Sequence, residues 1–298
     1  WWQSLDQSGT APQPEAAPQP CPPIAARPKQ LSVTQIETLL HNPYEIYARK
    51  ILNLRALDAV DTPPNAAHRG IFLHGLMERF IGGGHHLSAE AAQAFMALAK
   101  QEEALHGGGA ALMQFWQARL QALATWLADY EGRRAAHIEQ SHVELSGRLR
   151  FGDFTLTAKA DRIDRLKNGR FEIIDYKSGQ PPADNRVKNH LAPQLTLEAA
   201  ILRDGHFGEN DTKLSGQSAA LTYLRLSGRT PAAEPKSLAA DDKLIDGARD
   251  MLRRLMAAYD NEAQPYLVHI RPRPRFGMRN LNDMPFDHLA RCPEWQEE

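Results

Sequence analysis

The sequence has few cysteines, no long apolar run and almost no net charge, and each of these shortages excludes a class of protein. Cys21 and Cys292 are too few for a disulfide framework, and they fit a reducing, cytoplasmic compartment. No apolar segment is long enough to cross a bilayer, so we expect no contact with a membrane. Because the formal net charge is only -1, any binding to nucleic acid must rest on local basic patches.

The chain also lacks an initiator methionine and a signal peptide, since it begins Trp1-Trp2-Gln3. We therefore expect it to be a piece of a longer protein. Residues 1–30 are rich in proline, alanine and glutamine, which predicts an extended linker without a core of its own. Residues 31–298 have an ordinary globular composition and are expected to form one domain.

Local patterns predict an α/β domain. The segment Thr34-Gln35-Ile36-Glu37 has the pattern of a capping box that opens a helix, and Asn42-Pro43 is typical of the start of a second helix. Helices and strands in this order predict a mixed central sheet flanked by helices, with a helical N-terminal part. Apolar periodicity predicts helices near 65–81, 88–105, 111–134, 191–204 and 241–260, and strands between 139 and 177 and near 218–226.

The segment from Asp161 to Lys177 predicts a β-hairpin that carries charged residues. Asn168-Gly169 is a strong turn signal, because both residues tolerate a positive φ. A two-residue loop would place Asp161 opposite Tyr176, and a three-residue loop would place it opposite Asp175. In either register the two carboxylates are neighbours, and Lys177 lies on the same face as Asp175.

Two carboxylates and an ammonium group are costly to crowd together unless they bind something. The oxygens of Asp161 and Asp175 are hard ligands that suit Mg²⁺ or Mn²⁺. Such a cation would polarise a phosphate and acidify a water molecule, and Lys177 would hold or help deprotonate that water. The alternative is an ordinary cross-strand ion pair at a strand end. Asp164 should face the opposite way from Asp161 and act structurally, paired with a neighbouring arginine, 162 or 165.

Several motifs together resemble a known family. Ala160-Asp161 and Asp175-x-Lys177 resemble the signature of the PD-(D/E)xK nucleases, and their surroundings look like the RecB-like branch. Arg69 to His74 resembles the histidine helix of that branch, and Pro193-Gln194-Leu195 resembles its glutamine motif. The segments 31–37 and 289–295 are similar to the C-terminal nuclease domain of AddB proteins in their alphaproteobacterial form. The resemblance runs from about residue 31 to the end and implies a restriction-endonuclease-like core.

The resemblance also implies a set of site residues. His74, Asp161, Asp175 and the carbonyl of Tyr176 would bind the metal ion, and Gln194 would position water or the substrate phosphate. Taken alone, a histidine at position 74 is more often simply exposed or hydrogen-bonded. Taken alone, a glutamine after Pro193 can equally serve to cap a helix.

The sequence departs from the family pattern in two places. Many relatives carry a tyrosine four residues after the glutamine, where this chain has Glu198. Others bind an iron–sulfur cluster with four cysteines, one of them at the position of Asn42. Two cysteines cannot form a four-thiolate site, so we expect no iron–sulfur cluster.

For the other charged residues, the sequence is compatible with more than one role. Glu144 could supply one more carboxylate, but a solvent-facing strand residue is the expected arrangement. The basic tract at 271–275, with Arg279, is compatible with phosphate contacts or with a solvated tail.

The resemblance implies a metal-dependent DNA nuclease domain within an AddAB-type helicase–nuclease, which processes double-strand breaks for recombinational repair. Its partners would be an AddA-like subunit and the single strand released from an unwound duplex end. One alternative is a free-standing RecB-like exonuclease, although the proline-rich lead-in argues against it. Another is a catalytically silent DNA-binding or scaffold module, although intact Asp161, Asp175 and Lys177 favour catalysis.

Overall fold

The structure, a computed structural model, describes residues 16–55, 66–106, 109–210, 213–270 and 286–295. The chain divides into two compact units. The first comprises residues 1–28, 37–57 and 257–298, and the second comprises residues 29–36 and 58–256. The basic tract at 271–275 with Arg279, and the first half of the predicted linker, lie outside the described residues.

The second unit is built on a mixed seven-stranded sheet, which confirms the predicted fold class. The order is β5-β2-β3-β4-β6-β7, and β1 pairs with β3. The pairs β1–β3 and β4–β6 are parallel, and the other pairs are antiparallel. The strands are β1 (Gln30–Ser32), β2 (Ile138–Phe151), β3 (Phe154–Leu166), β4 (Phe171–Lys177), β5 (His206–Phe207), β6 (Ser218–Leu226) and β7 (Ala233–Ala239).

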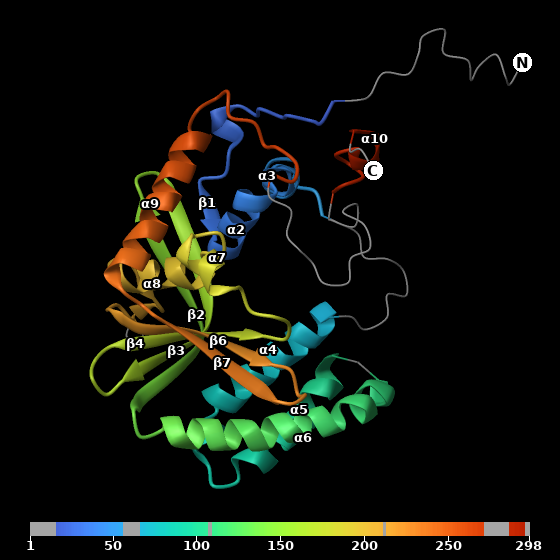
Figure 1. Ribbon diagram of the computed structural model, residues 1–298, viewed down its shortest axis with the longest axis vertical. Coiled ribbons are helices and arrows are strands. Elements are labelled where there is room, and N and C mark those ends of the chain that lie inside the picture. The colour runs from blue at the N-terminus through green and yellow to red at the C-terminus, as the bar shows by residue number, and fades with distance from the viewer. Residues whose placement is uncertain (1–15, 56–65, 107–108, 211–212, 271–285, 296–298) are drawn as a thin grey trace, which may run out of the picture. The chain divides into compact units, whose positions relative to one another are not determined.

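Helices cover both faces of this sheet (Figure 1). One layer contains α4 (Ala66–Gly82), α5 (Ala91–His106) and α6 (Gly109–Arg134), with η3 (His85–Leu87) between the first two. Its apolar side chains pack against Ile174 and Tyr176 of β4. Because side chains alternate along a strand, Asp175 and Lys177 point to the other face. That face carries α7 (Asp184–Lys188), α8 (Gln194–Asp204) and α9 (Asp242–Tyr259).

Helix α2 comprises Val33–His41. It begins two residues before position 35, where a helix capped by Thr34 would start. The Ser32 N–H donates to Gln35 Oε1 at 3.0 Å, and the Gln35 N–H donates to Ser32 Oγ at 3.2 Å. This reciprocal pair is the capping box, so the predicted box of Thr34 and Glu37 is wrong. Ser32 ends β1 with an extended backbone, which leaves it as the last residue before the helix.

Strand β7 was not predicted, and its composition explains why. Its residues, Ala-Glu-Pro-Lys-Ser-Leu-Ala, include no β-branched side chain. β7 pairs only with β6 and so forms an edge of the sheet, where a proline is tolerated. β1 and β5, with three and two residues, are too short to show a periodic pattern.

The first unit has a small core around Tyr44, Phe286 and Cys292. As predicted, Pro43 begins a helix, but the Asn42 side chain does not cap it and instead accepts a hydrogen bond from the His269 N–H at 3.4 Å. The short helices of this unit are η1 (Ile24–Ala26), α3 (Pro43–Ile46), η2 (Tyr47–Ile51) and α10 (Cys292–Trp295).

The last residues of the predicted linker are held to this first unit. The Arg27 guanidinium donates to the carbonyl oxygens of Tyr259, Asn261 and Glu262 at 2.7 to 2.9 Å. The domain boundary at residue 30 stays a prediction.

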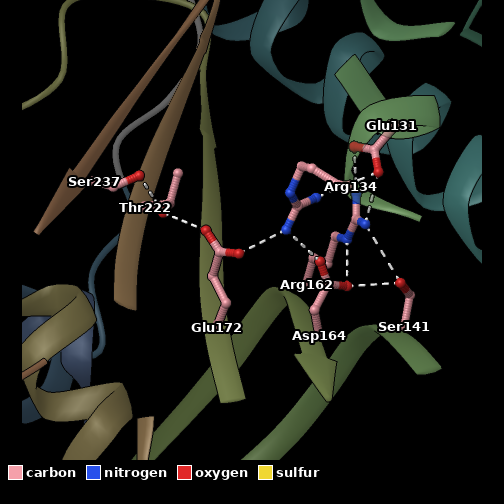
Figure 2. A network of polar contacts seen from close by, with 8 residues as sticks. All are labelled: Glu131, Arg134, Ser141, Arg162, Asp164, Glu172, Thr222 and Ser237. Atoms are coloured by element: carbon pink, nitrogen blue, oxygen red, sulfur yellow. Dashed lines mark hydrogen bonds and ion pairs between the residues drawn. The ribbon is translucent and has the colours of Figure 1, made fainter. Parts of the chain in front are cut away.

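A buried polar network ties α6 to the sheet (Figure 2). Arg162 of β3 is fully buried and donates two hydrogen bonds to Glu131 of α6, at 2.7 and 2.9 Å. Its Nε donates to Asp164 at 2.6 Å, and Arg134 bridges Asp164 and Glu172 at 2.7 Å. Asp164 is therefore structural, as predicted, and the network fixes the strand that carries Asp161. Ser141, Thr222 and Ser237 complete the network.

Candidate active site

The register of the β3–β4 hairpin decides between the two predicted arrangements. Leu166 N–H donates to Arg170 O at 2.8 Å, which leaves a loop of three residues, 167–169. Gly169 has a φ of 79°, the left-handed backbone that such a loop needs at its last position. Arg162 pairs with Ile174, so the next position along each strand sets Asp161 opposite Asp175. The three-residue alternative is the correct one.

Asp161 lies where the paired part of the hairpin ends. Its Oδ2 accepts a hydrogen bond from the Tyr176 N–H at 2.8 Å. Its Oδ1 lies 3.2 Å from Nδ1 of His74 on α4, and this hydrogen bond raises the pKa of His74. The ring of Tyr176 packs edge-on against His74, with centroids 6.1 Å apart. Two elements far apart in sequence therefore meet at Asp161.

Glu144 of β2 also reaches this place, although we expected it to face solvent. It lies between the pairs Val143–Arg162 and Leu145–Ala160, which sets it opposite Asp161. Its φ of 53° is unusual for a non-glycine residue inside a strand. The ligand atoms of His74, Glu144 and Asp161 lie within 4.8 Å of one another. The Glu144 side chain is 20% exposed and also forms an ion pair with Lys159, so it faces solvent only in part. No local sequence signal reveals the left-handed backbone that turns this side chain.

Asp175 is more deeply buried than Asp161, with 3% of its side chain exposed against 15%. Lys177 Nζ lies 2.9 Å from Oδ1 and 2.7 Å from Oδ2 of Asp175. Burial raises the pKa of Asp175 to about 6, and the Asp161 charge adds to this while Lys177 opposes it. Burial alone would lower the pKa of Lys177, but the charge of Asp175 outweighs it and the pKa is raised. Lys177 is therefore an ammonium group.

Gln194, the first residue of α8, joins Lys177 and Asp175. Its Oε1 accepts from Lys177 Nζ at 3.2 Å, and its Nε2 donates to Asp175 Oδ1 at 2.5 Å. The side chain does not cap the helix, because Pro193 is the N-cap and no side-chain cap bond forms. Gln194 thus belongs to the same cluster as the two residues of β4.

Glu198, one helical turn after Gln194, lies behind this cluster. Its Oε1 lies 3.4 Å from Gln194 Nε2, and 1% of the residue is exposed. Burial raises the pKa of Glu198 well above its usual value, and the charges of Asp175 and Asp161 add to this. The i, i+4 spacing from Gln194 is the sequence signal that places Glu198 here.

Most of the chain, in a range that includes all of these site residues, matches one family of known proteins. A family model described as "PD-(D/E)XK nuclease superfamily" matches residues 30–269. The chain belongs to this superfamily.

The similar relatives of this PD-(D/E)XK chain are much longer proteins. An uncharacterized protein of Rickettsia felis is 30% identical over 220 residues, which cover 68% of the chain and 25% of that protein. A Streptococcus agalactiae serotype Ia protein, named as one subunit of an ATP-dependent helicase/deoxyribonuclease, is 27% identical over 186 residues. That match covers 59% of the chain and 17% of the streptococcal protein. The chain therefore spans a quarter or less of the length of these relatives.

A solved structure titled as a putative exonuclease from Eubacterium rectale is also similar. It is 10% identical, with a TM-score of 0.47, and the match covers 87% of the chain and 94% of that structure.

The residues of this PD-(D/E)XK site fit a divalent cation. His74, Glu144 and Asp161 offer one nitrogen and two carboxylate groups within 4.8 Å of one another. Asp175 lies opposite Asp161 and contacts Lys177 and Gln194. Oxygen ligands of this kind suit Mg²⁺ or Mn²⁺.

A second group of possible ligand atoms lies in the first unit. His269 Nε2 lies 2.8 Å from Asp287 Oδ1, and the Cys292 sulfur lies within 4.8 Å of both. Burial raises the pKa of the Cys292 thiol to about 12, so the thiol is protonated. A buried His–Asp pair beside a neutral thiol accounts for this group. Absence of an iron–sulfur cluster stays a prediction.

None of the helices in the described part of the chain is long and apolar enough to cross a membrane. This agrees with the absence of long apolar runs in the sequence.

Replacing Asp175 with asparagine should stabilise the metal-free protein. At pH 7 the Asp175 carboxylate is charged although burial raises its pKa to about 6, so its charge opposes folding. Asp175→Asn keeps the shape and removes that charge. In EDTA the variant should be more stable than wild type by an amount on the order of 1 kcal/mol. Thermal or urea unfolding at pH 7 measures the difference.

The direction of this stability change can be tested by varying the pH and by adding metal. Because the folded pKa of Asp175 is raised, wild-type stability should fall as pH rises from about 4 to about 6, the interval between the unfolded and folded values. The advantage of Asp175→Asn should therefore disappear near pH 4. Millimolar Mn²⁺ should stabilise wild type more than the variant. If the variant is less stable in EDTA and metal shifts both proteins equally, Asp175 is only an ion-pair partner of Lys177.

Proposed function

We propose that this chain is the metal-dependent DNA nuclease domain of an AddAB-type helicase–nuclease. It would hydrolyse phosphodiester bonds in the strand released from an unwound duplex end, during repair of double-strand breaks by recombination. The observation that carries the proposal is the meeting of Asp161, Asp175 and Lys177 at one end of a hairpin. His74 and Gln194 approach the same end from two helices.

The metal ligands we assign are His74, Asp161, Asp175 and the Tyr176 carbonyl, with Glu144 as an added carboxylate. A bound Mg²⁺ or Mn²⁺ ion would supply Lewis acidity at the scissile phosphate. Binding of a cation would also relieve the repulsion between the two facing aspartates.

The remaining residues would handle the attacking water and the developing charge. The Lys177 ammonium can donate a hydrogen bond to the water or to a phosphate oxygen, where negative charge grows during the reaction. Gln194 holds that ammonium at 3.2 Å and keeps it beside Asp175. Asp161, Asp175, Lys177 and Gln194 are thus the proposed catalytic set.

The AddB assignment rests on the streptococcal relatives named as helicase/deoxyribonuclease subunits and on the terminal motifs of the chain. From it follow an AddA-like partner subunit and a cytoplasmic location, both as proposals. The division into a linker at 1–30 and a nuclease domain at 31–298 is proposed on the same basis. A family model that begins at residue 30 supports this division.

Metal-dependent cleavage is the test of this function. The full chain is incubated with labelled single-stranded DNA in EDTA, Mg²⁺, Mn²⁺ or Ca²⁺. We expect products only with Mg²⁺ or Mn²⁺, because the hard oxygen ligands need a cation that also activates the phosphate. A gel of the labelled products measures the rate.

Two other outcomes would favour the two alternative functions, a silent scaffold module and a free-standing exonuclease. DNA binding without cleavage in every metal would favour a silent scaffold module. Cleavage by the chain alone, unaffected by an added AddA-like subunit that fails to bind it, would favour a free-standing exonuclease.

A further inference from the structure

Three arginines from three separate elements of the second unit lie near one another, and two of them flank one tryptophan. The guanidinium carbons of Arg69 on α4 and of Arg119 on α6 each lie 5.4 Å from the centroid of the Trp116 ring. Arg229 belongs to the turn between β6 and β7 and is exposed. Its neighbour Gly228 has a φ of 63° and packs against the backbone of Arg119, so the turn lies directly on α6.

The positive charges in this cluster oppose one another. Burial lowers the pKa of Arg69, and the charges of Arg119 and Arg229 lower it further. The Arg69 Nε is buried without a hydrogen-bond partner in the described part of the chain. Guanidinium groups that lie close together repel one another. An anion that accepts hydrogen bonds from several of them relieves this repulsion.

The cluster adjoins the candidate active site. Arg69 donates to the carbonyl oxygen of Ser178, which directly follows Lys177, at 3.4 Å. Arg69 also precedes the site residue His74 by five positions on α4, which is about 7.5 Å along the helix axis. A chain of phosphates that runs through the active site would therefore pass close to the cluster.

We propose that Arg69, Arg119 and Arg229, with Trp116, form a subsite for the phosphodiester backbone of the DNA strand next to the bond that is cut. The proposal rests on the proposed nuclease function. Guanidinium groups match phosphate oxygens in shape and charge, and arginine beside an aromatic ring is a frequent combination in single-strand binding. Because the net charge of the whole chain is only -1, such a local concentration of positive charge is what strand binding requires.

Binding of single-stranded DNA in EDTA tests the subsite without cleavage. The full chain is titrated against a fluorescein-labelled oligothymidylate, and anisotropy is followed at several salt concentrations. Arg229→Gln and Arg119→Gln should each weaken binding by up to about tenfold, the loss of one charge-assisted hydrogen bond. Each should also reduce the slope of log affinity against log salt by about 0.7, the value for one phosphate contact with a single strand.

Arg254→Gln is the matched control, because Arg254 is exposed on α9, on the other side of the sheet from α6. It removes the same charge and should leave both affinity and salt slope unchanged. Arg229 is the decisive position, since an exposed side chain can be changed without disturbing the fold. Unfolding curves check this for Arg119→Gln.

The subsite proposal is overturned if the cluster variants bind like wild type, if Arg254→Gln weakens binding equally, or if wild type binds no DNA. Its failure is separable from that of the proposed function. Arginine-dependent binding without cleavage in any metal would refute catalysis and keep the subsite. Normal cleavage with binding that ignores these arginines would refute the subsite alone.

Discussion

Lys177→Ala should cut single-stranded DNA at least about 100-fold more slowly than wild type in Mg²⁺ or Mn²⁺. The reason is the position of the ammonium group, 2.7 Å from Asp175 and 3.2 Å from Gln194, with no role as a metal ligand. Metal binding should persist, because the carboxylates and the histidine remain. Initial cleavage rates measure the first effect, and the thermal shift caused by Mn²⁺ measures the second.

Lys236→Ala is a matched control for this variant. Lys236 of β7 forms an ion pair with Asp184 and its side chain is 33% exposed, close to the 30% of Lys177. This control should cleave DNA like wild type. Undiminished cleavage by Lys177→Ala would show that Lys177 only neutralises Asp175. A variant that no longer responds to Mn²⁺ would show that the lysine is needed to shape the metal site.

Arg162→Met should cost about 3–5 kcal/mol of unfolding free energy. Arg162 has no exposed side-chain surface and donates hydrogen bonds to both Glu131 and Asp164 (Figure 2). Methionine fills part of the space but leaves these buried carboxylates short of one positive charge, and Arg134 compensates only in part. Urea denaturation at neutral pH measures the change.

Arg165→Met is the comparison within the same strand. Arg165 is 47% exposed and pairs with the similarly exposed Glu139, so its loss should cost no more than about 1 kcal/mol. Equal losses for the two variants would contradict the structural importance of the buried network.

The same network should make wild type sensitive to acid. Burial alone would raise the pKa of Asp164, but Arg162 and Arg134 outweigh it and hold the pKa below its usual value. A depressed carboxylate pKa stabilises the fold above the unfolded pKa, and this stabilisation disappears as pH falls through the folded value. The difference in unfolding free energy between wild type and Arg162→Met should therefore become smaller at low pH.

The sequence by itself determined the local features of this protein. Asn168-Gly169 predicted the hairpin, because the turn depends on a few backbone angles that these residues permit. Alternation along β4 placed Asp175 and Lys177 on one face, and apolar periodicity located α4, α6 and β6 to within a few residues. Asp161 and Asp175 were therefore expected as neighbours in either register. These features follow from spacing within one segment, which is visible in the sequence.

Only the tertiary structure decided the features that need distant segments to meet. The loop length, and with it the facing pair of aspartates, is fixed by the complete sheet. Glu144 reaches His74 and Asp161 through a left-handed backbone, which no side-chain preference of glutamate indicates. Arginine is usually exposed, so the burial of Arg162 depends on Glu131 arriving from α6. Arg69, Arg119 and Arg229 are separated by long stretches of sequence, and only the packing of α4, α6 and the β6–β7 turn brings their charges together.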